Sequence, residues 1–288
     1  MKTAALCLCL TTTISSFAQV IHFTTNQEGN IVVKGDLNDT VQARFIFDTG
    51  GGLNVISDKF FQRIKGTAIF EHYYTGFRHD GDRLDLKVYK IPSLSVGSYK
   101  IKNALFGVTS VLDEWNMDGI VSLINFKTVP LTIDYKQKQL RIETRSSATQ
   151  IAKTAQSMPI KIHQFEDVSL DIFVAVCING NSLDMEFDTG SLMEDILVNS
   201  KFISSLGIDT SKTKNSDFIT PFTRQSFRRY VATIDSVHYC GLQHEPLRKV
   251  RIDFKENMIY EGIIGAGYFY DLPFTIDIAN KRILVQAR

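Results

Sequence analysis

The stretch FIFDTGGG at residues 45–52 has a counterpart in MEFDTGS at residues 185–191. In both stretches an Asp-Thr-Gly tripeptide follows a Phe at the end of an apolar-rich run, and the two aspartates, Asp48 and Asp188, lie 140 residues apart. At average residue frequencies, about 0.06 such tripeptides are expected in a chain of this length. The repetition therefore indicates that the two stretches have a common cause.

The self-similarity extends beyond the tripeptide. Residues 118–142 align without a gap with residues 261–285, and residues 56–66 resemble residues 198–207. The offsets between the copies are 140, 142 and 143 residues, so the chain is a duplication with small insertions. Each of the shorter segments predicts one short helix, because it opens with a candidate N-cap and closes with a glycine. These candidate N-caps are Ser57 and Asn199.

Most of each copy has the pattern of short β-strands, with β-branched or alternating runs bounded by Gly, Asn, Asp or Pro. Little helical periodicity is found outside the two short helices. We therefore predict an all-β protein in which each copy forms a Greek-key-like or barrel lobe. The expected strands are 31–34, 41–47, 84–91, 100–108, 131–134, 139–143, 172–178, 183–187, 230–237, 249–254, 274–277 and 282–285.

The duplication divides the chain into two domains. We assign residues 19–145 to an N-terminal lobe and residues 159–288 to a C-terminal lobe, each with one Asp-Thr-Gly. The polar segment between them is interpreted as a linker over residues 146–158. The alternative is that the middle of this segment pairs as an edge strand. Two lobes of roughly 130 residues each have an ordinary domain size.

Residues 1–18 have the pattern of a signal peptide. A single Lys2 precedes an apolar run, and the small residues Ser16 and Ala18 suit cleavage before Gln19. We expect an exported protein, periplasmic or extracellular, with a buried N-terminal strand as the alternative. No other segment approaches 18 unbroken apolar residues, so no membrane insertion is expected.

Charge and cysteine content exclude several classes of partner. Removing residues 1–18 leaves 31 basic and 31 acidic residues, a balance that argues against nucleic acid or an anionic membrane. Cys177 and Cys240 either form a disulfide within the second lobe or stay as buried thiols. They are too few for a metal site, and the six histidines show no metal-ligand spacing, so no metal and no cofactor are expected.

The paired tripeptides predict a specific chemistry. An Asp at the end of a strand, followed by Thr-Gly, places a carboxyl in a tight turn where the glycine lets the backbone approach closely. Pseudo-twofold symmetry would bring Asp48 and Asp188 face to face. Two adjacent carboxyls share one proton, so one activates water and the other protonates a substrate carbonyl. The alternative is that both turns are structural and belong to lobes that never meet.

The sequence resembles the retropepsin/pepsin superfamily of aspartic peptidases, in an exported bacterial, two-lobed, single-chain form. The resemblance rests on the hydrophobic-Asp-Thr-Gly motifs at 45–50 and 185–190, with support from residues 118–122 and 261–265 and from the closing hairpins. It implies two homologous β-barrel lobes related by pseudo-twofold symmetry. It also implies a monomeric endopeptidase that binds a peptide or protein substrate as an extended strand in the cleft between the lobes.

The resemblance also implies roles for particular residues. Asp48 and Asp188 would form the catalytic dyad. Thr49 and Thr189 would hydrogen-bond across the lobe interface, Gly50 and Gly190 would bring N–H groups to the carboxyls, and Ser191 would hydrogen-bond the outer oxygen of Asp188. A flap over the substrate is expected at residues 72–83, with Tyr73, Tyr74 and Gly76 as contacts. Residues 218–230 occupy the equivalent place in the second copy, either as a basic rim of the site or as a solvated loop. Trp115 is expected to pack in the core.

Two positions depart from the family pattern. Gly51 follows the first tripeptide where the family has Ser, Ala or Thr, and Ser122 stands where the second copy has Gly265. Gly51 removes a possible hydroxyl donor to Asp48. These departures motivate an alternative function, a catalytically impaired peptide-binding protein on the same scaffold.

Overall fold

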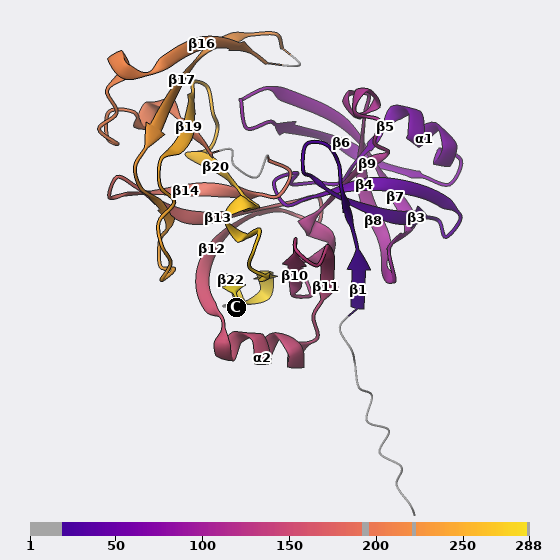
Figure 1. The fold of residues 1–288 in the computed structure, drawn as a ribbon. Helices are drawn as coiled ribbons and strands as arrows, with labels where there is room; N and C mark the ends of the chain where they lie inside the picture. The colour runs from indigo at the N-terminus through magenta and orange to yellow at the C-terminus, as the bar shows by residue number, and fades with distance from the viewer. Residues whose placement is uncertain (1–18, 192–195, 221–222, 287–288) are drawn as a thin grey trace, which may run out of the picture.

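The computed structural model describes residues 19–191, 196–220 and 223–286, so the predicted signal peptide lies outside the described residues. The protein is all-β, as predicted, with two lobes side by side above a sheet that they share (Figure 1). Two α-helices occur in the described ranges, α1 (Asp58–Ile64) and α2 (Arg145–Thr154). None of the described helices is long and apolar enough to cross a bilayer.

The first lobe is a closed six-stranded barrel. Its strands pair in a ring that the contact between the first and the last of them completes. Outside the ring, β2 (Thr24–Thr25) makes a short pairing with β3, and the edge strand β6 (Ile69–Phe77) pairs with β7 along most of its length. The strands of the ring, in spatial order, are β3 (Ile31–Leu37), β4 (Val41–Asp48), β9 (Gly119–Ser122), β5 (Val55–Ser57), β8 (Tyr99–Thr109) and β7 (Arg83–Val96).

The second lobe repeats this arrangement. Parallel pairing sets Asp48 beside Ser122 in the first lobe and Asp188 beside Gly265 in the second, so the repeated segments have the same place in both. Its strands, in spatial order, are β13 (Ser169–Ile178), β14 (Asn181–Asp188), β20 (Gly262–Gly265), β15 (Ile196–Asn199), β19 (Val250–Lys255), β17 (Ser226–Ile234) and β16 (Lys214–Ile219), and β18 (Val237–Tyr239) pairs with β13.

Six strands from both halves form the sheet beneath the lobes. At its centre β10 pairs antiparallel with β21, and Thr132 lies opposite Thr275, its equivalent in the other copy. The pseudo-twofold axis therefore passes between these two threonines. In spatial order the strands are β1 (Gln19–His22), β11 (Gln139–Ile142), β10 (Leu131–Asp134), β21 (Phe274–Asp277), β22 (Arg282–Val285) and β12 (Gln156–Phe165).

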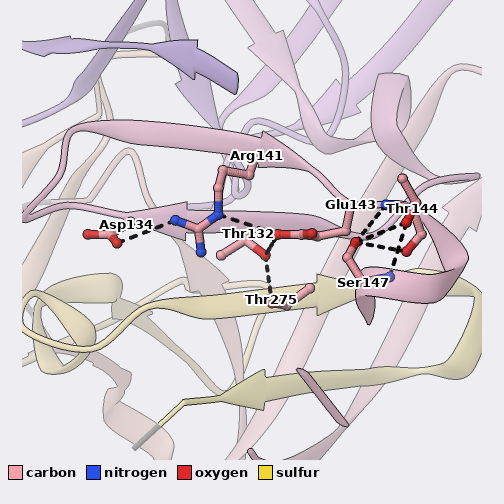
Figure 2. Close-up of polar contacts among 7 residues, drawn as sticks. All are labelled: Thr132, Asp134, Arg141, Glu143, Thr144, Ser147 and Thr275. Carbon is pink, nitrogen blue, oxygen red and sulfur yellow. Dashed lines mark hydrogen bonds and ion pairs between the residues drawn. The ribbon is translucent and has the colours of Figure 1, made fainter. Parts of the chain in front are cut away.

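A buried polar network marks this junction (Figure 2). The hydroxyls of Thr132 and Thr275 lie 2.7 Å apart, and Thr132 donates to Glu143 Oε1 at 2.7 Å. Figure 2 shows Arg141 between two carboxylates, with Asp134 at 3.5 Å and Glu143 at 3.4 Å. Buried charges are tolerated when they are paired in this way, so the network joins the two halves without an orphaned group at Glu143.

The segment between the lobes differs from the expected linker. Its middle forms α2, which lies below the shared sheet and leads into β12 (Figure 1), so the edge-strand alternative is wrong. The helix begins with a capping box, in which Thr144 accepts from Ser147 N and the Ser147 side chain accepts from Thr144 N. With Ala148 as its buried residue, it has little of the apolar periodicity that predicts helices.

The two predicted short helices have different outcomes. Ser57 caps α1 as expected, accepting from Phe60 N at 3.1 Å. Asn199 caps only a 3-10 turn over Ser200–Phe202. In that segment the Ser205 hydroxyl donates to the carbonyl of Phe202, a local bond that competes with helix continuation.

The remaining alternative for the cysteines is decided in favour of a bond. Cys177 of β13 and Cys240, just after β18, form a disulfide that closes 63 residues of the second lobe.

Candidate active site

The two Asp-Thr-Gly loops meet on the pseudo-twofold axis. The backbone N–H of Thr49 donates to Thr189 Oγ1 at 3.0 Å, and the N–H of Thr189 donates to Thr49 Oγ1 at 3.0 Å. The two hydroxyls then donate to the carbonyls of Phe187 and Phe47, at 2.7 and 3.4 Å. Both threonines are buried, so this reciprocal set holds the ends of β4 and β14 together. The tripeptides therefore do not cap separate lobes.

Each aspartate is packed against the glycine of the opposite loop. An added Cβ at Gly50 would lie 2.5 Å from Asp188 Cγ, and one at Gly190 would lie 2.5 Å from Asp48 Cγ. The glycines are also donors, because Gly50 N–H reaches Asp48 Oδ1 at 2.9 Å and Gly190 N–H reaches Asp188 Oδ1 at 2.7 Å. Any side chain at these two positions would displace a carboxyl.

A hydrogen bond joins the Asp48 and Asp188 carboxyls, and their surroundings are not equal. Burial raises the pKa of Asp48, while hydrogen bonds from Asp188 and from backbone N–H groups act in the opposite direction. Burial and the adjacent charge of Asp48 raise the pKa of Asp188 well above its usual range. Both pKa values are raised, so the pair keeps a shared proton at a higher pH than an isolated carboxyl would.

Three other residues singled out by the sequence lie at these loops. Ser191 hydrogen-bonds Asp188, and its backbone N–H is the donor, to Asp188 Oδ1 at 3.0 Å. Gly51 also donates its N–H to Asp48, so this carboxyl keeps a donor despite the missing hydroxyl. The hydroxyl of Ser122 is buried and has no hydrogen-bond partner among the described residues.

A cavity of about 600 Å³ opens above the two carboxyls. The β6–β7 hairpin contributes Tyr74 and Gly76 to its lining, whereas Tyr73 is 73% exposed and is not part of the lining. Trp115 also lines the cavity and is 48% exposed, so the expectation that it packs in the core is wrong. A periodic pattern does not reveal such a role, because η1 (Val111–Trp115) is a short 3-10 turn that brings this ring to the rim.

The tip of the β6–β7 hairpin crosses the cleft to the second lobe. Asn257 Nδ2 donates to the carbonyl of Asp80 at 2.8 Å, and Ile259 N–H donates to the carbonyl of His79 at 3.1 Å. Thr223 N–H donates to Asp82 Oδ1 at 2.9 Å. The hairpin therefore covers the cavity as a flap that both lobes hold.

The equivalent hairpin of the second lobe, β16–β17, does not cover the cavity with its basic side chains. Arg224, Arg228 and Arg229 are all absent from the lining. Arg228 and Arg229 pair instead with Asp217 and Asp253, at 3.6 and 3.3 Å. This arrangement fits the solvated-loop alternative better than a basic rim.

Two acids that the sequence analysis did not single out line the same cavity, Asp171 of β13 and Glu186 of β14. Burial, with the nearby charge of Asp48, raises the pKa of Asp171 to about 7. Burial, with the charges of Asp188, Asp171 and Asp48, raises the pKa of Glu186 well above its usual range. The available signal was Glu186 itself, an acid two residues before the repeated motif, where the first copy has Ile46.

Comparison with known proteins agrees with this geometry. Residues 33–124 match the model of a family described as aspartyl protease. The match spans the first Asp-Thr-Gly, the flap and the β9 segment beside Asp48. No curated protein matches the chain. The family match over the first lobe, together with the all-β fold, supports a retropepsin-like aspartic protease family for this chain.

Proposed function

We propose that the protein is an aspartic endopeptidase in which Asp48 and Asp188 form one catalytic dyad. The observation that carries this proposal is the hydrogen bond between the two carboxyls at the floor of the covered cavity. Asp-Thr-Gly loops locked by reciprocal threonine contacts give the rigidity that catalytic groups need. Because both aspartates come from one chain, the enzyme would act as a monomer.

The unequal carboxyls suggest a role for each. In the assignment that we propose, Asp48 is the ionised member and takes a proton from a water molecule as the water oxygen bonds to the substrate carbonyl carbon. Asp188 gives its proton to the carbonyl oxygen, which produces a neutral tetrahedral diol. Asp48 then passes its proton to the leaving nitrogen while Asp188 recovers one from the diol, the C–N bond breaks, and the dyad returns to its initial state. This sequence uses no cofactor.

The substrate is proposed to be an extended peptide or protein segment. The cavity lies between the lobes and under the flap, and the flap strand β6 is an edge strand whose free backbone groups can pair with a peptide. An extended segment fits such a site because its main chain pairs while alternate side chains enter pockets on the two lobes.

Cleavage of a diverse peptide library by the purified protein tests the proposal, with products identified by mass spectrometry from pH 3 to 8. We expect cleavage by the native protein, and a loss of about 1000-fold or more in kcat for Asp48→Asn and for Asp188→Asn with unchanged folding. Full activity of either variant would exclude the shared dyad. Peptide binding without cleavage across the whole pH range would instead support the impaired, peptide-binding function.

We also propose that the protein acts outside the cytoplasm. The Cys177–Cys240 disulfide supports this location, because such bonds form and persist in oxidising compartments. Expression of the full chain, followed by fractionation and N-terminal sequencing, tests it. The expected mature N-terminus is Gln19, and a cytoplasmic protein that still begins at Met1 would contradict the proposal.

A further inference from the structure

The walls of the cleft differ where the two copies are equivalent. In the β3–β4 hairpin Ile46 lies opposite Val32, and in the β13–β14 hairpin Glu186 lies opposite Phe173. Ile46 and Glu186 each precede the dyad aspartate of their lobe by two residues. Two residues share a face of a strand and are separated by about 7 Å, so Glu186 is within a side-chain length of the dyad.

A second acid accompanies Glu186 on the same hairpin. Counting two residues back along the opposite strand from Phe173 gives Asp171, which lines the same cavity. The corresponding position in the first lobe is Asn30. An apolar residue and an amide in the first lobe are therefore replaced by two carboxyls in the second.

Neither carboxyl has a hydrogen-bond or ion-pair partner among the described residues. Glu186 is only 3% exposed, and its side chain lines the cavity, yet no described residue donates a hydrogen bond to it or forms an ion pair with it. The Asp171 carboxyl also lines the cavity and has no hydrogen-bond donor or ion-pair partner in the described part of the chain. Arg78 is the permanent cation among the described lining residues, and it lies 3.9 Å from Asp80 at the flap tip. Ionised buried acids are normally paired with a cation, and the described residues supply none here, so a ligand that brings a positive charge would favour the ionised forms of both carboxyls.

The neighbouring side chains fit a cation that carries an aliphatic stem. Leu197, Ile263 and Tyr260 line the same side of the cavity as the two acids. Burial raises the pKa of the Tyr260 hydroxyl, and the nearby charges of Glu186 and Asp171 raise it further. A lysine or arginine stem can pack on these residues while its charged end reaches the carboxyls. In the described ranges no three His, Cys, Asp or Glu side chains are grouped to hold a metal ion, which favours an organic cation.

We propose that Asp171 and Glu186 form a substrate subsite that takes a lysine or arginine side chain close to the cleaved bond. This inference rests on the proposed peptidase function. The opposite wall, in the first lobe, is apolar and includes Ile46, Val55 and Ile120. The protein would therefore cut next to basic residues on the side of the bond that the second lobe binds, with an apolar residue on the other side.

The test uses two peptides, identical except that one has lysine and the other norleucine at the position that faces the second lobe. Norleucine keeps the aliphatic stem and removes the charge. For the native protein we expect kcat/KM to be about 10- to 100-fold higher with lysine, because only lysine supplies the missing counter-charge. Glu186→Gln should reduce this ratio to near one, and Asp171→Asn should reduce it in part.

Asp235→Asn is the matched control, because it removes an exposed acid of the second lobe that does not line the cavity. It should leave the lysine-to-norleucine ratio unchanged. Equal cleavage of the two peptides by the native protein would overturn the subsite and leave the peptidase function standing. A Glu186→Gln variant that slows both peptides by the same factor would also overturn it, since the acid would then act through the dyad.

Binding measurements separate the subsite from the catalytic proposal. If the native protein cleaves neither peptide, fluorescence anisotropy of the labelled pair is measured with native protein and with the two variants. Tighter binding of the lysine peptide, lost in Glu186→Gln, would support the subsite although the peptidase function had failed. Equal affinity for both peptides would overturn the subsite.

Discussion

At the floor of the cleft the two lobes make the same contacts, and two residues away they differ. Thr49 and Thr189 exchange equivalent hydrogen bonds, and each tripeptide glycine packs on the aspartate of the other lobe. On the strands that deliver these loops, however, Ile46 of the first lobe is replaced by Glu186 in the second. The floor is symmetric because each loop contacts the other. The wall residues Ile46 and Glu186 each contact their own lobe and the cleft, so symmetry between the lobes does not restrict which residue occupies either position.

The barrels differ in a similar way. In the first lobe β7 is one strand of 14 residues, and its end pairs with β3 to close the ring. In the second lobe the corresponding strand is interrupted, and β18, of three residues, makes the equivalent pairing with β13. The Cys177–Cys240 disulfide lies next to this short pairing. Each closure pairs three residues of one strand with three of the other, and the second closure has a covalent bond in addition.

The largest effect should come from breaking that disulfide. A bond that closes 63 residues restricts the unfolded chain, so Cys177→Ala with Cys240→Ala should lower the free energy of unfolding by about 4 kcal/mol. Denaturant titration measures this loss. Hydrogen exchange should show faster opening in β13 and β18 than in β3 and β7. Equal loss of protection in both lobes would contradict the idea that the bond serves the second closure.

The next largest effect should come from the symmetric floor. Gly50→Ala and Gly190→Ala each place a Cβ about where the opposite carboxyl group lies, and a displaced carboxyl should reduce kcat/KM by about 100-fold or more. Gly66→Ala is the control, because no atom lies within 4 Å of the added Cβ. Peptide cleavage assays compare the three variants. If only one of the two loop variants loses activity, the loops are not functionally equivalent.

These contrasts explain how far the sequence alone can be interpreted. The sequence pattern of one lobe occurs twice in the chain. The strands, the two lobes and the pairing of Asp48 with Asp188 could therefore be predicted from the repeated segments. Helix α2 could not, because its evidence is a capping box at Thr144 and Ser147 in an unrepeated polar segment. The acids Asp171 and Glu186 were missed for a related reason, since an acid that occurs in only one copy gives no repeat signal.

Atomic detail at the site also lay beyond sequence patterns. Whether Ser191 contacts Asp188 through its hydroxyl or its N–H depends on loop geometry. Trp115 lines the cavity because the chain folds it back to the rim, which no local periodicity encodes. Local sequence fixes strands and caps, whereas cavity walls are assembled from several strands that are distant in the chain.

A smaller effect is expected from Asp171 in the wall of the cleft, because its ionisation lowers the free energy of unfolding. The pKa of Asp171 is about 7 in the folded protein and near 3.9 in an unfolded chain, so between these values the folded state binds more protons. The contribution of this acid to stability is therefore lost as pH rises from about 4 to about 7. Facing Asp171 are the acids Asp48 and Glu186 and the hydroxyl of Tyr260, and no described residue pairs with it.

Replacing Asp171 by Asn should remove this cost. We expect the free energy of unfolding to increase by about 1–3 kcal/mol at pH 8 and to change little at pH 4. Denaturant titrations at the two pH values measure the difference, with Asp235→Asn as the exposed control. A stability gain of the same size at both pH values would mean that packing, and not ionisation, is responsible.

The smallest effect is expected on KM, and it should distinguish the β6–β7 hairpin from the β16–β17 hairpin. The first-lobe hairpin reaches the second lobe through Asn257, whose side chain donates to the carbonyl of Asp80 at 2.8 Å. Asn257→Ala removes a bond worth about 1 kcal/mol, so KM should rise by about fivefold while kcat changes little. Arg228→Ala is the comparison in the other hairpin, because Arg228 pairs with Asp217 and does not line the cavity. Its KM should match that of the native protein. A rise in KM for Arg228→Ala would mean that the second hairpin also contacts the substrate, and the cleft would then have two flaps.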